Sequence, residues 1–491
     1  MKSQTEGKKN VILLVFDTLR PDYLSCYGAS SVESQNMDEV ASTGVQFDAA
    51  FAAGPGTPIS HGGIFTGQYP SRSGVTGQYI DLPEEYQTLP EWFNERGYKS
   101  LGIAGPSKIA SDFGYDRGFD RYFEPYYDIG YQDRKPTKDY FKNLVSDIDI
   151  FRDGMRTAFR GEIKNTKFKF DYIKDWVRSN NEPFFVFANL LEAHAPYHPP
   201  RGYRRAFDPE FSEPSIFLAE YFLDHVGHHS DPDVRLDRID HVQTGDGIGK
   251  YLADPSYLNE AELEVLSRWY SASIKYLDDM FGQFLEFYKS ELADDTILVV
   301  TADHGEQLGE HGLIAHSHYL YDETLQVPLL MTGPDIDEAP DGLASLVDLY
   351  PTLANQAGIE VPEFTDGRKL FQHGGRDHVF FEHGERRIRE FRESAHGKYL
   401  SDDQLSRFAA GRKAIRTDSY KLVIDSQNNT SLYDVTGSIE TEIQAQGVEE
   451  DLAGQIEDTL SGEFGRWPEG DPESYSLDEE VIGSLEDLGY V

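Results

Sequence analysis

Cysteine is almost absent from this chain of 491 residues, in which Cys26 is the only one. A single thiol excludes a disulfide within the chain, and with it the disulfide-dense scaffolds of small secreted domains. Long apolar runs are absent as well, since no stretch approaches the ~18 residues that span a bilayer. The apolar run near the N-terminus is too short for the core of a secretory signal and is better explained as a strand. We therefore expect a cytoplasmic protein with no membrane insertion.

Basic residues are scarce in this sequence. The chain carries 45 lysines and arginines against 86 aspartates and glutamates, which gives a net charge of −41. Such a surface repels nucleic acids and anionic membranes, and we expect neither as a partner. Acidic residues spread along the whole chain are typical of proteins of the haloarchaeal type, in which high salt screens the self-repulsion. The glycine, proline and aromatic contents are ordinary for a folded protein.

Strand-like apolar runs alternate with helical patterns along most of the chain. The expected strands, together with one extended segment at 45–51, lie at residues 11–16, 100–104, 183–191, 296–301 and 327–332. Helices are predicted at residues 37–43, 88–97, 168–177 and 261–289. The early proline and final glycine indicate the second, and the spacing of apolar positions indicates the last two. This alternation predicts an α/β fold with a mostly parallel central sheet between helices.

The alternation stops near residue 375. Short strand patterns at 378–383, 413–418, 420–425 and 430–435 predict a small antiparallel sheet, followed by an acidic helical tail with a closing helix at 477–488. A chain of this length can form a large and a small unit, and we expect an α/β domain over residues 1–375 and a C-terminal subdomain over 376–491. Irregular stretches at about 120–165 and 200–256 are predicted to be insertions in the large domain.

Polar side chains follow three of the predicted strands. Asp17 ends the first, Glu192 and His194 follow a second, and Asp303 and His304 follow a third. Because the carboxyl ends of parallel strands meet at one edge of the sheet, where α/β proteins bind ligands, we expect these groups to converge. Taken alone, Asp17 fits the cap of a following helix equally well. The two later clusters favour a divalent-metal site.

The loop GPGTPISHGGIFTGQYPSRSG at residues 54–74 is punctuated by glycine and proline ahead of a helical pattern. Its exposed backbone N–H groups suit an anion, and its reactive side chains are Thr57, Ser60 and His61. For an isolated loop, Thr57 or Ser60 as a plain helix cap would be favoured. If the loop reaches the same sheet edge, the Thr57 hydroxyl joins the metal site.

Several histidines are candidates for substrate contacts. The imidazoles that we expect to face the substrate are those of His61, His194, His316 and His318. A further histidine cluster at 225–229 has no tight metal-ligand spacing, and a surface loop explains it better.

Five sequence blocks carry a family resemblance. They resemble the sulfatase family of the alkaline-phosphatase-like superfamily, occur in family order and cover nearly the whole chain apart from the insertions. The fold that this resemblance implies is a mixed, mostly parallel sheet between helices, with a small C-terminal antiparallel sheet and helix. The blocks are NVILLVFDTLRPDYLSCYG, TPISHGGIFTG, TADHGEQLGEHG, LYDETLQVPLL and KAIRTDSYKL with LYDV.

The resemblance implies a metal site. Asp17 matches the metal aspartate of the first strand, and Asp303 with His304 matches the later metal pair of the phosphonate monoesterase-like branch. With Thr57, these residues are expected to bind one divalent ion. Oxygen ligands alone would favour Ca or Mg, and the imidazole of His304 also allows Mn or Zn.

The resemblance also implies substrate histidines. His194, in EAHAPY, matches the substrate histidine of the family, with Glu192 in place of the usual aspartate. His316 or His318 falls where the family has a second substrate-contacting histidine. The lysine that sometimes precedes that histidine would be Ser317 here, so it is missing.

The nucleophile departs from the family pattern. Sulfatases carry C/S-x-P-x-R, in which the cysteine or serine is oxidised to formylglycine. Counting back from Thr66 and Gly67 places Thr57 where the family has its cysteine or serine, and His61 where the family has its arginine. Oxidation of the β-carbon of threonine would give a ketone, so no formylglycine is expected. A threonine hydroxyl activated by the metal remains available as the nucleophile.

These residues predict a metal-dependent ester hydrolase that acts on sulfate, phosphate or phosphonate esters of a small molecule or glycan. Thr57 attacks in line, and His194, His316 or His318 protonates the leaving oxygen. Two alternatives stay open: a sulfo- or phosphotransferase that passes the same Thr57 ester to a sugar in surface-glycan biosynthesis, and an inactive anion-binding homologue. The oligomeric state is also open.

Overall fold

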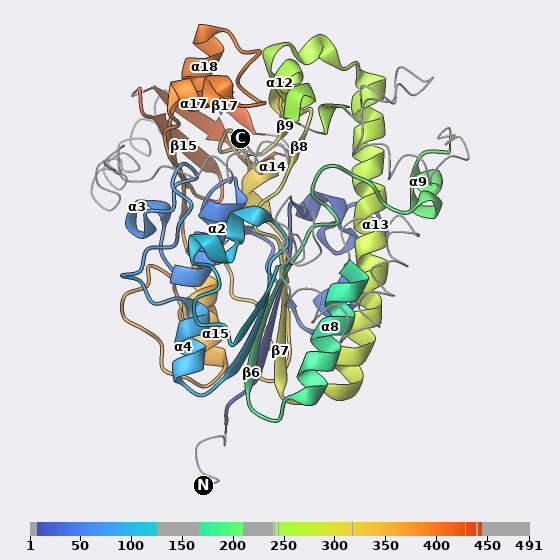
Figure 1. The fold of residues 1–491 in the computed structure, drawn as a ribbon, viewed down its shortest axis with the longest axis vertical. Helices are drawn as coiled ribbons and strands as arrows, with labels where there is room; N and C mark the ends of the chain where they lie inside the picture. Colours follow the sequence, from blue (N-terminus) through green and yellow to red (C-terminus); the bar gives the residue numbers. More distant parts are fainter. Residues whose placement is uncertain are drawn as a thin grey trace, which may run out of the picture.

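A computed structural model of the chain describes residues 7–124, 166–209, 239, 241–243, 245–316, 318–427, 429–437 and 440–443. Its centre is a seven-stranded sheet with the strand order β2-β11-β7-β1-β6-β4-β5 (Figure 1). The parallel strands are β1 (Asn10–Phe16), β4 (Lys99–Ile103), β5 (Arg121–Phe123), β6 (Phe184–Leu190) and β7 (Thr296–Thr301). The antiparallel strand β11 (Leu329–Thr332) pairs with β7 and carries β2 (Val45–Gln46) at the edge. The α/β fold with a mostly parallel central sheet is confirmed.

Strand β1 lies at the middle of this sheet, between β6 and β7. Its residues from Val11 onward are completely buried, as a strand covered on both faces requires. Val15 is level with Asn189 of β6 and with Thr301 of β7. The side chains that follow these strands therefore emerge at one edge of the sheet.

Helices cover both faces of the central sheet. On one side α8 (Thr166–Ser179) and α1 (Gln35–Thr43) pack against the long α13 (Glu260–Glu291). On the other side lie α2 (Thr57–Thr66), α4 (Leu89–Glu95) and α15 (Leu349–Gln356) (Figure 1). Asn259 and Glu262 form a capping box that starts α13, so the helix predicted at 261–289 is confirmed within two residues.

Two predicted extended segments are each divided between two sheets. A small sheet with the order β10-β3-β12 takes β10 (Gln326–Val327), β3 (Ala50–Phe51) and β12 (Ala344–Ser345). The segments predicted as continuous at 45–51 and 327–332 therefore each contribute to this sheet and to the central one. Pro328 explains one division, because it has no N–H to donate between β10 and β11.

The predicted C-terminal antiparallel sheet is confirmed and has five strands. They run in sequence order as β13 (Val379–His383), β14 (Arg412–Arg416), β15 (Tyr420–Asp425), β16 (Thr430–Asp434) and β17 (Thr441–Ile443). Two helices, α17 (Ile388–Glu393) and α18 (Asp402–Ala409), separate β13 from β14. Figure 1 shows this sheet beyond the upper end of the central sheet, opposite the N-terminus. The closing helix predicted at 477–488 lies outside the described residues.

The predicted insertions begin and end differently from expectation. Residues Arg121–Phe123 form β5, so the segment predicted at 120–165 opens with an edge strand of the central sheet. The segment predicted as irregular at 200–256 contains α9 (Arg201–Phe207) and α12 (Gly245–Ala253). The histidine cluster at 225–229 lies outside the described residues. Among the residues with a described structure, no helix is both long and apolar enough to cross a membrane.

Short elements complete the described chain. They are the strands β8 (Gln307–Leu308) and β9 (Ile314–Ala315), the helices α3 (Pro70–Ser73), α14 (Asp322–Leu325) and α16 (Leu370–His373), and 3-10 turns that include Ser107–Ile109. Strands β8 and β9 form an antiparallel hairpin directly after the strand end at Asp303.

Candidate active site

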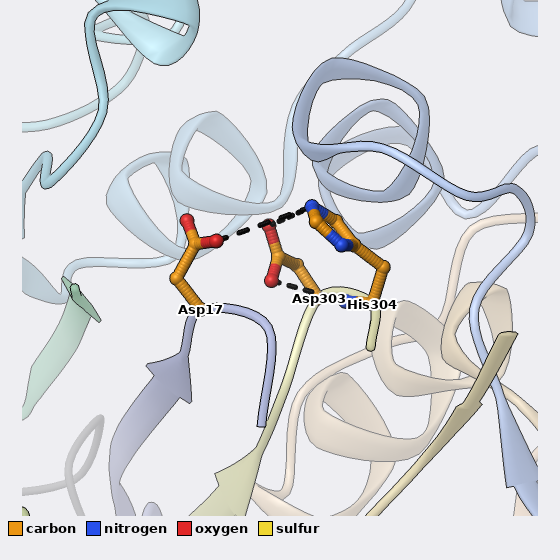
Figure 2. A group of neighbouring side chains, drawn as sticks. All are labelled: Asp17, Asp303 and His304. Atoms are coloured by element: carbon orange, nitrogen blue, oxygen red, sulfur yellow. Dashed lines mark hydrogen bonds and ion pairs between the residues drawn. The ribbon is translucent and has the colours of Figure 1, made fainter. Parts of the chain in front are cut away.

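Asp17, Asp303 and His304 meet at the carboxyl edge of the central sheet (Figure 2). Each offers one ligand atom, and these atoms all lie within 4.8 Å of one another. Asp17 follows β1, and the other two residues follow the neighbouring strand β7. All three side chains are completely buried. Within the described ranges this is the one cluster of three such side chains that is compact enough for a metal ion.

One oxygen of each carboxylate is held by the protein. Asp303 Oδ1 accepts hydrogen bonds from the backbone N–H groups of Thr18 at 3.3 Å and His304 at 3.0 Å. Asp17 Oδ2 accepts from the side-chain amide of Asn189 at 3.1 Å. The remaining oxygens, Asp17 Oδ1 and Asp303 Oδ2, are buried and have no hydrogen-bond partner in the described part of the chain. They lie 3.9 and 3.5 Å from His304 Nε2.

The electrostatics of this cluster fit a cation. Burial, with the nearby Asp303 carboxylate, raises the pKa of Asp17 to about 8. Burial raises the pKa of Asp303 to about 7. Two buried carboxyl groups in contact do not readily both ionise, and a divalent ion between them would remove that penalty. The unsatisfied oxygens and the imidazole therefore form a donor set that suits a divalent metal ion.

Thr57 is the first residue of α2 and lies beside the cluster. Its Oγ1 is 3.2 Å from His304 Nε2, and its side chain is buried. Pro58 follows it, at a helix position where the missing N–H costs nothing. His304 Nδ1 donates to the carbonyl oxygen of Gly305 at 2.8 Å, a tautomer that turns the lone pair of Nε2 toward Thr57.

The plain capping alternatives are wrong. Gly56 is the N-cap of α2, so neither Thr57 nor Ser60 caps that helix. Arg20 is the N-cap of the first helical turn after β1, so Asp17 does not cap it. Thr18, which follows Asp17, has a left-handed φ of 60° that turns the chain sharply at the strand end. The carboxylate of Asp17 thus faces the cluster and not a helix terminus.

His61 lies one turn further along α2, behind Thr57. Its Nδ1 donates to the carbonyl oxygen of Thr57 at 2.8 Å, and its Nε2 lies 3.4 Å from the amide of Asn189. The ring is completely buried and meets the ring of Phe187 edge-on. Burial lowers the pKa of His61 to about 3, so the imidazole is neutral in the folded protein. We expected His61 to face the substrate; it lies instead where it supports Thr57 and Asn189.

His194 and His316 lie next to the cluster. The His316 ring is 4.3 Å from that of His304 and 5.2 Å from that of His194, measured between centroids. His316 Nδ1 contacts Glu306 Oε1 at 3.0 Å, and Glu306 Oε2 accepts from the Tyr197 hydroxyl at 3.1 Å. Burial, followed by the nearby His304, lowers the pKa of His316 well below its usual value.

His318 lies elsewhere. Its Nδ1 is 3.5 Å from Arg386 Nη1, and its ring lies 5.3 Å from His396 and 5.4 Å from Phe408. These neighbours all belong to the C-terminal part of the chain. The sequence left His316 and His318 as equal candidates; the structure brings His316 to the metal cluster and His318 to Arg386.

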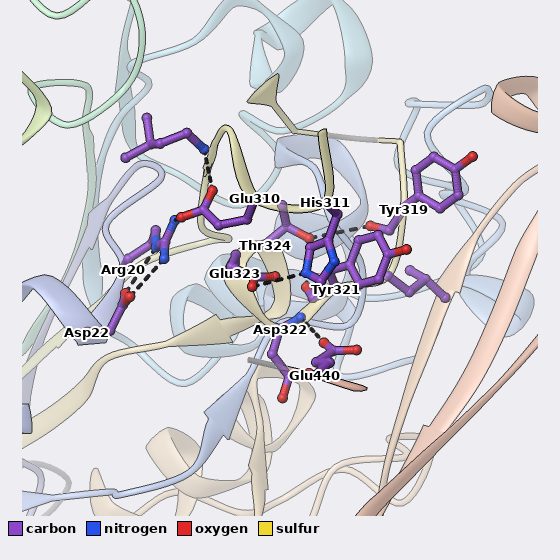
Figure 3. A network of polar contacts seen from close by, with 12 residues as sticks. Arg20, Asp22, Glu310, His311, Tyr319, Tyr321, Asp322, Glu323, Thr324 and Glu440 are labelled. Carbon is purple, nitrogen blue, oxygen red and sulfur yellow. Dashed lines mark hydrogen bonds and ion pairs between the residues drawn. The ribbon is translucent and has the colours of Figure 1, made fainter. Parts of the chain in front are cut away.

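The loop that carries these histidines is held by a polar network (Figure 3). Arg20, just after β1, donates to the carbonyl oxygen of Glu306 at 2.9 Å and to Glu310 Oε1 at 2.7 Å. At the other end of the loop, Asp322 accepts hydrogen bonds from Lys421 and Arg416 of the C-terminal sheet, both at 2.9 Å. The loop is therefore fastened both to the central sheet and to the C-terminal sheet.

Sequence reasoning missed Asn189 and Glu306 of the site, together with Lys108 and Arg386, whose charges act on His316. Asn189 had a signal, because it is a polar residue in an otherwise apolar buried strand. Lys108 follows β4 at the same sheet edge, and Glu306 follows His304 by two positions. Arg386 had no signal, because it reaches the site only through the packing of the C-terminal sheet.

Comparison with known proteins gives a consistent family. The family model described as Sulfatase matches residues 9–359. The chain is 24% identical over 420 residues to an N-acetylglucosamine-6-O-sulfatase of Bacteroides thetaiotaomicron, covering 75% of this chain and 71% of that protein. It is 26% identical over 408 residues to human iduronate 2-sulfatase, covering 73% and 71%. An uncharacterized sulfatase YidJ of Escherichia coli is 23% identical over 376 residues, covering 74% and 70%.

Solved structures share the fold. The phosphonate monoester hydrolase of Agrobacterium radiobacter superimposes with a TM-score of 0.68 at 20% identity, covering 92% of this chain and 95% of that one. A protein solved with its substrate D-glucosamine-2-N,6-O-disulfate gives a TM-score of 0.65 at 19% identity, covering 96% and 100%.

Proposed function

Because the chain belongs to the sulfatase family, we propose that it is a metal-dependent hydrolase of sulfate, phosphate or phosphonate esters with Thr57 as its nucleophile. The observation that carries the proposal is the 3.2 Å contact between Thr57 Oγ1 and His304 Nε2, beside two buried carboxylates. A substrate ester at this point would meet a hydroxyl and a cation site together.

Asp17, Asp303 and His304 would hold one divalent ion, whether Ca, Mg, Mn or Zn, through the two unsatisfied oxygens and Nε2. When bound, the ion would supply positive charge that polarises the ester oxygens and lowers the pKa of a nearby hydroxyl. The chain's own contribution is orientation, because Asn189 fixes Asp17 and the N–H of Thr18 fixes Asp303.

In the proposed reaction Thr57 Oγ1 releases its proton to water and forms a bond to phosphorus or sulfur as the bond to the leaving oxygen breaks. The leaving oxygen takes a proton from His194. Burial and neighbouring cationic groups keep His316 neutral, so it serves as a hydrogen-bonding group between His304 and His194. Water then hydrolyses the Thr57 ester and restores the hydroxyl. His61 acts as a positioning residue through the Thr57 carbonyl.

Phosphate and phosphonate esters are the favoured substrates. A sulfo-threonine would be difficult to hydrolyse, because threonine gives no formylglycine from which sulfate can be eliminated. The likeness to a phosphonate monoester hydrolase supports this preference. We also propose a cytoplasmic location and a salt-rich working environment, on the basis of the single cysteine and the net charge of −41.

A parallel assay tests the function. An aryl sulfate, a phosphate monoester, a phosphodiester and a phosphonate monoester are supplied in high salt with each of the four metals. We expect turnover of at least one phosphoryl or phosphonyl ester, lost on chelation and on the substitution Thr57→Val. Undiminished turnover in that variant would overturn the nucleophile assignment. Cleavage only when a sugar acceptor is present would favour the transferase alternative, and anion binding without any turnover would favour the inactive homologue.

A further inference from the structure

A cluster of one guanidinium and two imidazoles lies beyond His316, away from the metal residues. Arg386, His318 and His383 form its centre, and we call them the Arg386 cluster. Arg386 Nη1 lies 3.5 Å from His318 Nδ1, and Nη2 lies 3.5 Å from His383 Nε2. The two guanidinium nitrogens therefore each face an imidazole nitrogen.

The backbone around Arg386 is fixed from two sides. His383 is the last residue of β13, and the N–H of Gly384 donates to the carbonyl oxygen of Thr76 at 2.8 Å. The N–H of Arg386 itself donates to the carbonyl oxygen of Ala409, also at 2.8 Å. The backbone that carries Arg386 is therefore held without substrate, which reduces the ordering that its guanidinium needs on binding.

The contact with Arg386 determines which ring nitrogen of His318 carries the proton, and this nitrogen is a buried hydrogen-bond donor. A guanidinium only donates, so Nδ1 of His318 is an acceptor and the proton of that imidazole lies on Nε2. His318 is only 1% exposed, and its Nε2 has no hydrogen-bond partner among the residues that the structure describes. A buried N–H without an acceptor is unfavourable, and an incoming oxygen atom would supply the missing hydrogen bond.

The surroundings of the cluster are positively charged although the chain as a whole is acidic. Burial and the nearby Arg386 lower the pKa of Lys108 to about 7. Burial and the nearby Arg412 lower the pKa of Arg386 to about 10. Burial, then Arg386 and three neighbouring imidazoles, lowers the pKa of His318 well below its usual value. Each of these effects is relieved by an anion placed among the three side chains.

Two nearby carboxylates are turned toward other partners. Glu306 accepts from His316 and Tyr197, as described above. Glu382, which precedes His383 on β13, is buried and lies 4.0 Å from Lys413 Nζ. Adjacent residues of a strand point to opposite faces, so Glu382 and His383 face different sides of the small sheet.

The position of the cluster relates it to the proposed reaction. His316 touches the His304 ring, and His318 is two residues further along the chain. Burial, and with it the Arg386 guanidinium, lowers the pKa of both His316 and His318, so all three groups lie close enough to interact electrostatically. Groups on the two sides of one substrate molecule can therefore reach His316 and the Arg386 cluster at the same time.

We propose that the Arg386 cluster, with Lys108, binds a second oxyanion on the leaving-group side of the substrate. The substrate would then be a doubly anionic ester, with one acidic group at the metal residues and a carboxylate, sulfate or phosphate at Arg386. This inference rests on the ester-hydrolase function proposed above. The same chemistry also fits a free inorganic anion, and the experiment separates the two sources.

The experiment compares matched substrates in the full-length protein with metal bound. Phenyl phosphate is compared with its carboxyphenyl isomers, and N-acetylglucosamine 6-phosphate with 2-N-sulfated glucosamine 6-phosphate. Arg386→Met should lower kcat/KM for the member with two acidic groups at least about tenfold more than for its partner with one acidic group. Arg389→Met is the control, because its side chain is 89% exposed and the substitution removes the same charge. An equal loss for both members of each pair would overturn the proposal.

A second measurement separates this proposal from the proposed function. Calorimetry of the Thr57→Ala protein with carboxyphenyl phosphate, phenyl phosphate and inorganic sulfate needs no turnover. We expect the doubly anionic compound to bind at least about tenfold more tightly than phenyl phosphate, with the advantage lost when Arg386→Met is added. Equal binding of the two esters would overturn the substrate assignment, and sulfate binding that alone depends on Arg386 would identify a free-anion site. Arg386→Lys keeps the positive charge but loses the planar guanidinium, so its affinity for carboxyphenyl phosphate should lie between those with Arg386 and with Arg386→Met. Thermal unfolding of the Arg386→Met protein shows whether that variant still folds.

Discussion

The hydroxyl oxygen of Thr57 lies 3.2 Å from Nε2 of His304, although 247 positions separate the two residues in the chain. The contact joins the first turn of α2 to the end of β7, and the carboxylates of Asp17 and Asp303 lie beside it. Burying these polar side chains costs more free energy than filling the same space with apolar ones. The contact therefore indicates a chemical role.

Thr57→Val removes the hydroxyl and keeps the shape of the side chain. If Thr57 is the nucleophile, kcat falls by about a thousandfold or more, while the protein still binds a divalent ion. Thr57→Ser, which keeps a hydroxyl, should retain measurable turnover. Steady-state kinetics and a metal titration on each purified variant give the answer, and comparable loss in the valine and serine variants would count against the role.

Asn189→Leu tests the support of Asp17. Because the amide donates to Asp17 Oδ2 and lies 3.4 Å from His61 Nε2, its loss frees both side chains to move. We expect metal affinity to fall by about 10- to 100-fold. Asn10→Leu, at the opposite end of the same sheet, is the matched control, since Asn10 accepts from the N–H of Phe184 far from the site. Competition against a chelating dye measures both affinities.

The free energy of unfolding of the metal-free protein should depend on pH through Asp17 and Asp303. Their pKa values in the folded chain, about 8 and about 7, lie above the ordinary value of 3.8. The folded state therefore holds protons that the unfolded state has released, and stability is lost as pH rises from about 4 to about 8. Each carboxyl contributes up to about 1.4 kcal/mol per pH unit.

Urea unfolding in the presence of a chelator, repeated across this pH range, checks that slope. Asp17→Asn should reduce it, and added metal should restore most stability at the alkaline end, where the carboxylates are ionised. A metal-free protein whose stability does not change between pH 4 and 8, with Asp17→Asn identical to it, would contradict the assignment.

His194→Gln tests the proton donor. A leaving oxygen that is strongly basic needs a proton, whereas nitrophenolate leaves without one. The variant should lose about 100-fold or more in kcat on alkyl or sugar esters and much less on nitrophenyl esters. The plot of log kcat against leaving-group pKa should become steeper than in the parent protein. An equal loss on all esters would assign His194 to binding instead.

Salt should stabilise this protein. A net charge of −41 produces self-repulsion that ions screen over a Debye length of about 8 Å at 0.15 M ionic strength and about 3 Å at 1 M. We expect the thermal midpoint and the activity to rise together as potassium chloride is raised from 0.1 M to 2 M. Maximal stability at low salt would remove the support for a haloarchaeal-type environment.

The local sequence was enough to find the centre of the fold. Val11 to Phe16 is apolar without interruption, which only a strand buried on both faces explains, and the polar residue after it marks the strand end. The same reasoning located Asp303 and His304. It failed at Pro328, where the chain leaves one sheet for another, because that change depends on which neighbours accept the strand.

The sequence could not decide whether His316 or His318 lies at the metal cluster, and the reason is different. The two residues share one segment and one residue type, and only the β8–β9 hairpin and the packing of Phe408 decide which imidazole turns to His304. Arg386 was hidden in the same way. Its place depends on the docking of a sheet whose contacts are distant in sequence, and periodicity carries no information about docking.

The loop fastened by Arg20 at one end and by Asp322 at the other connects two stretches of the chain that the proposed substrate would contact. The metal residues and Thr57 precede that loop or begin it. His383 ends β13 of the sheet that the loop is tied to, and Arg386 follows three residues later. On the proposed function, substitutions around His383 and Arg386 would change which alcohol is released, while the residues that hold the transferred group stay where they are. Relatives with this architecture would diversify their substrates most readily through that later stretch.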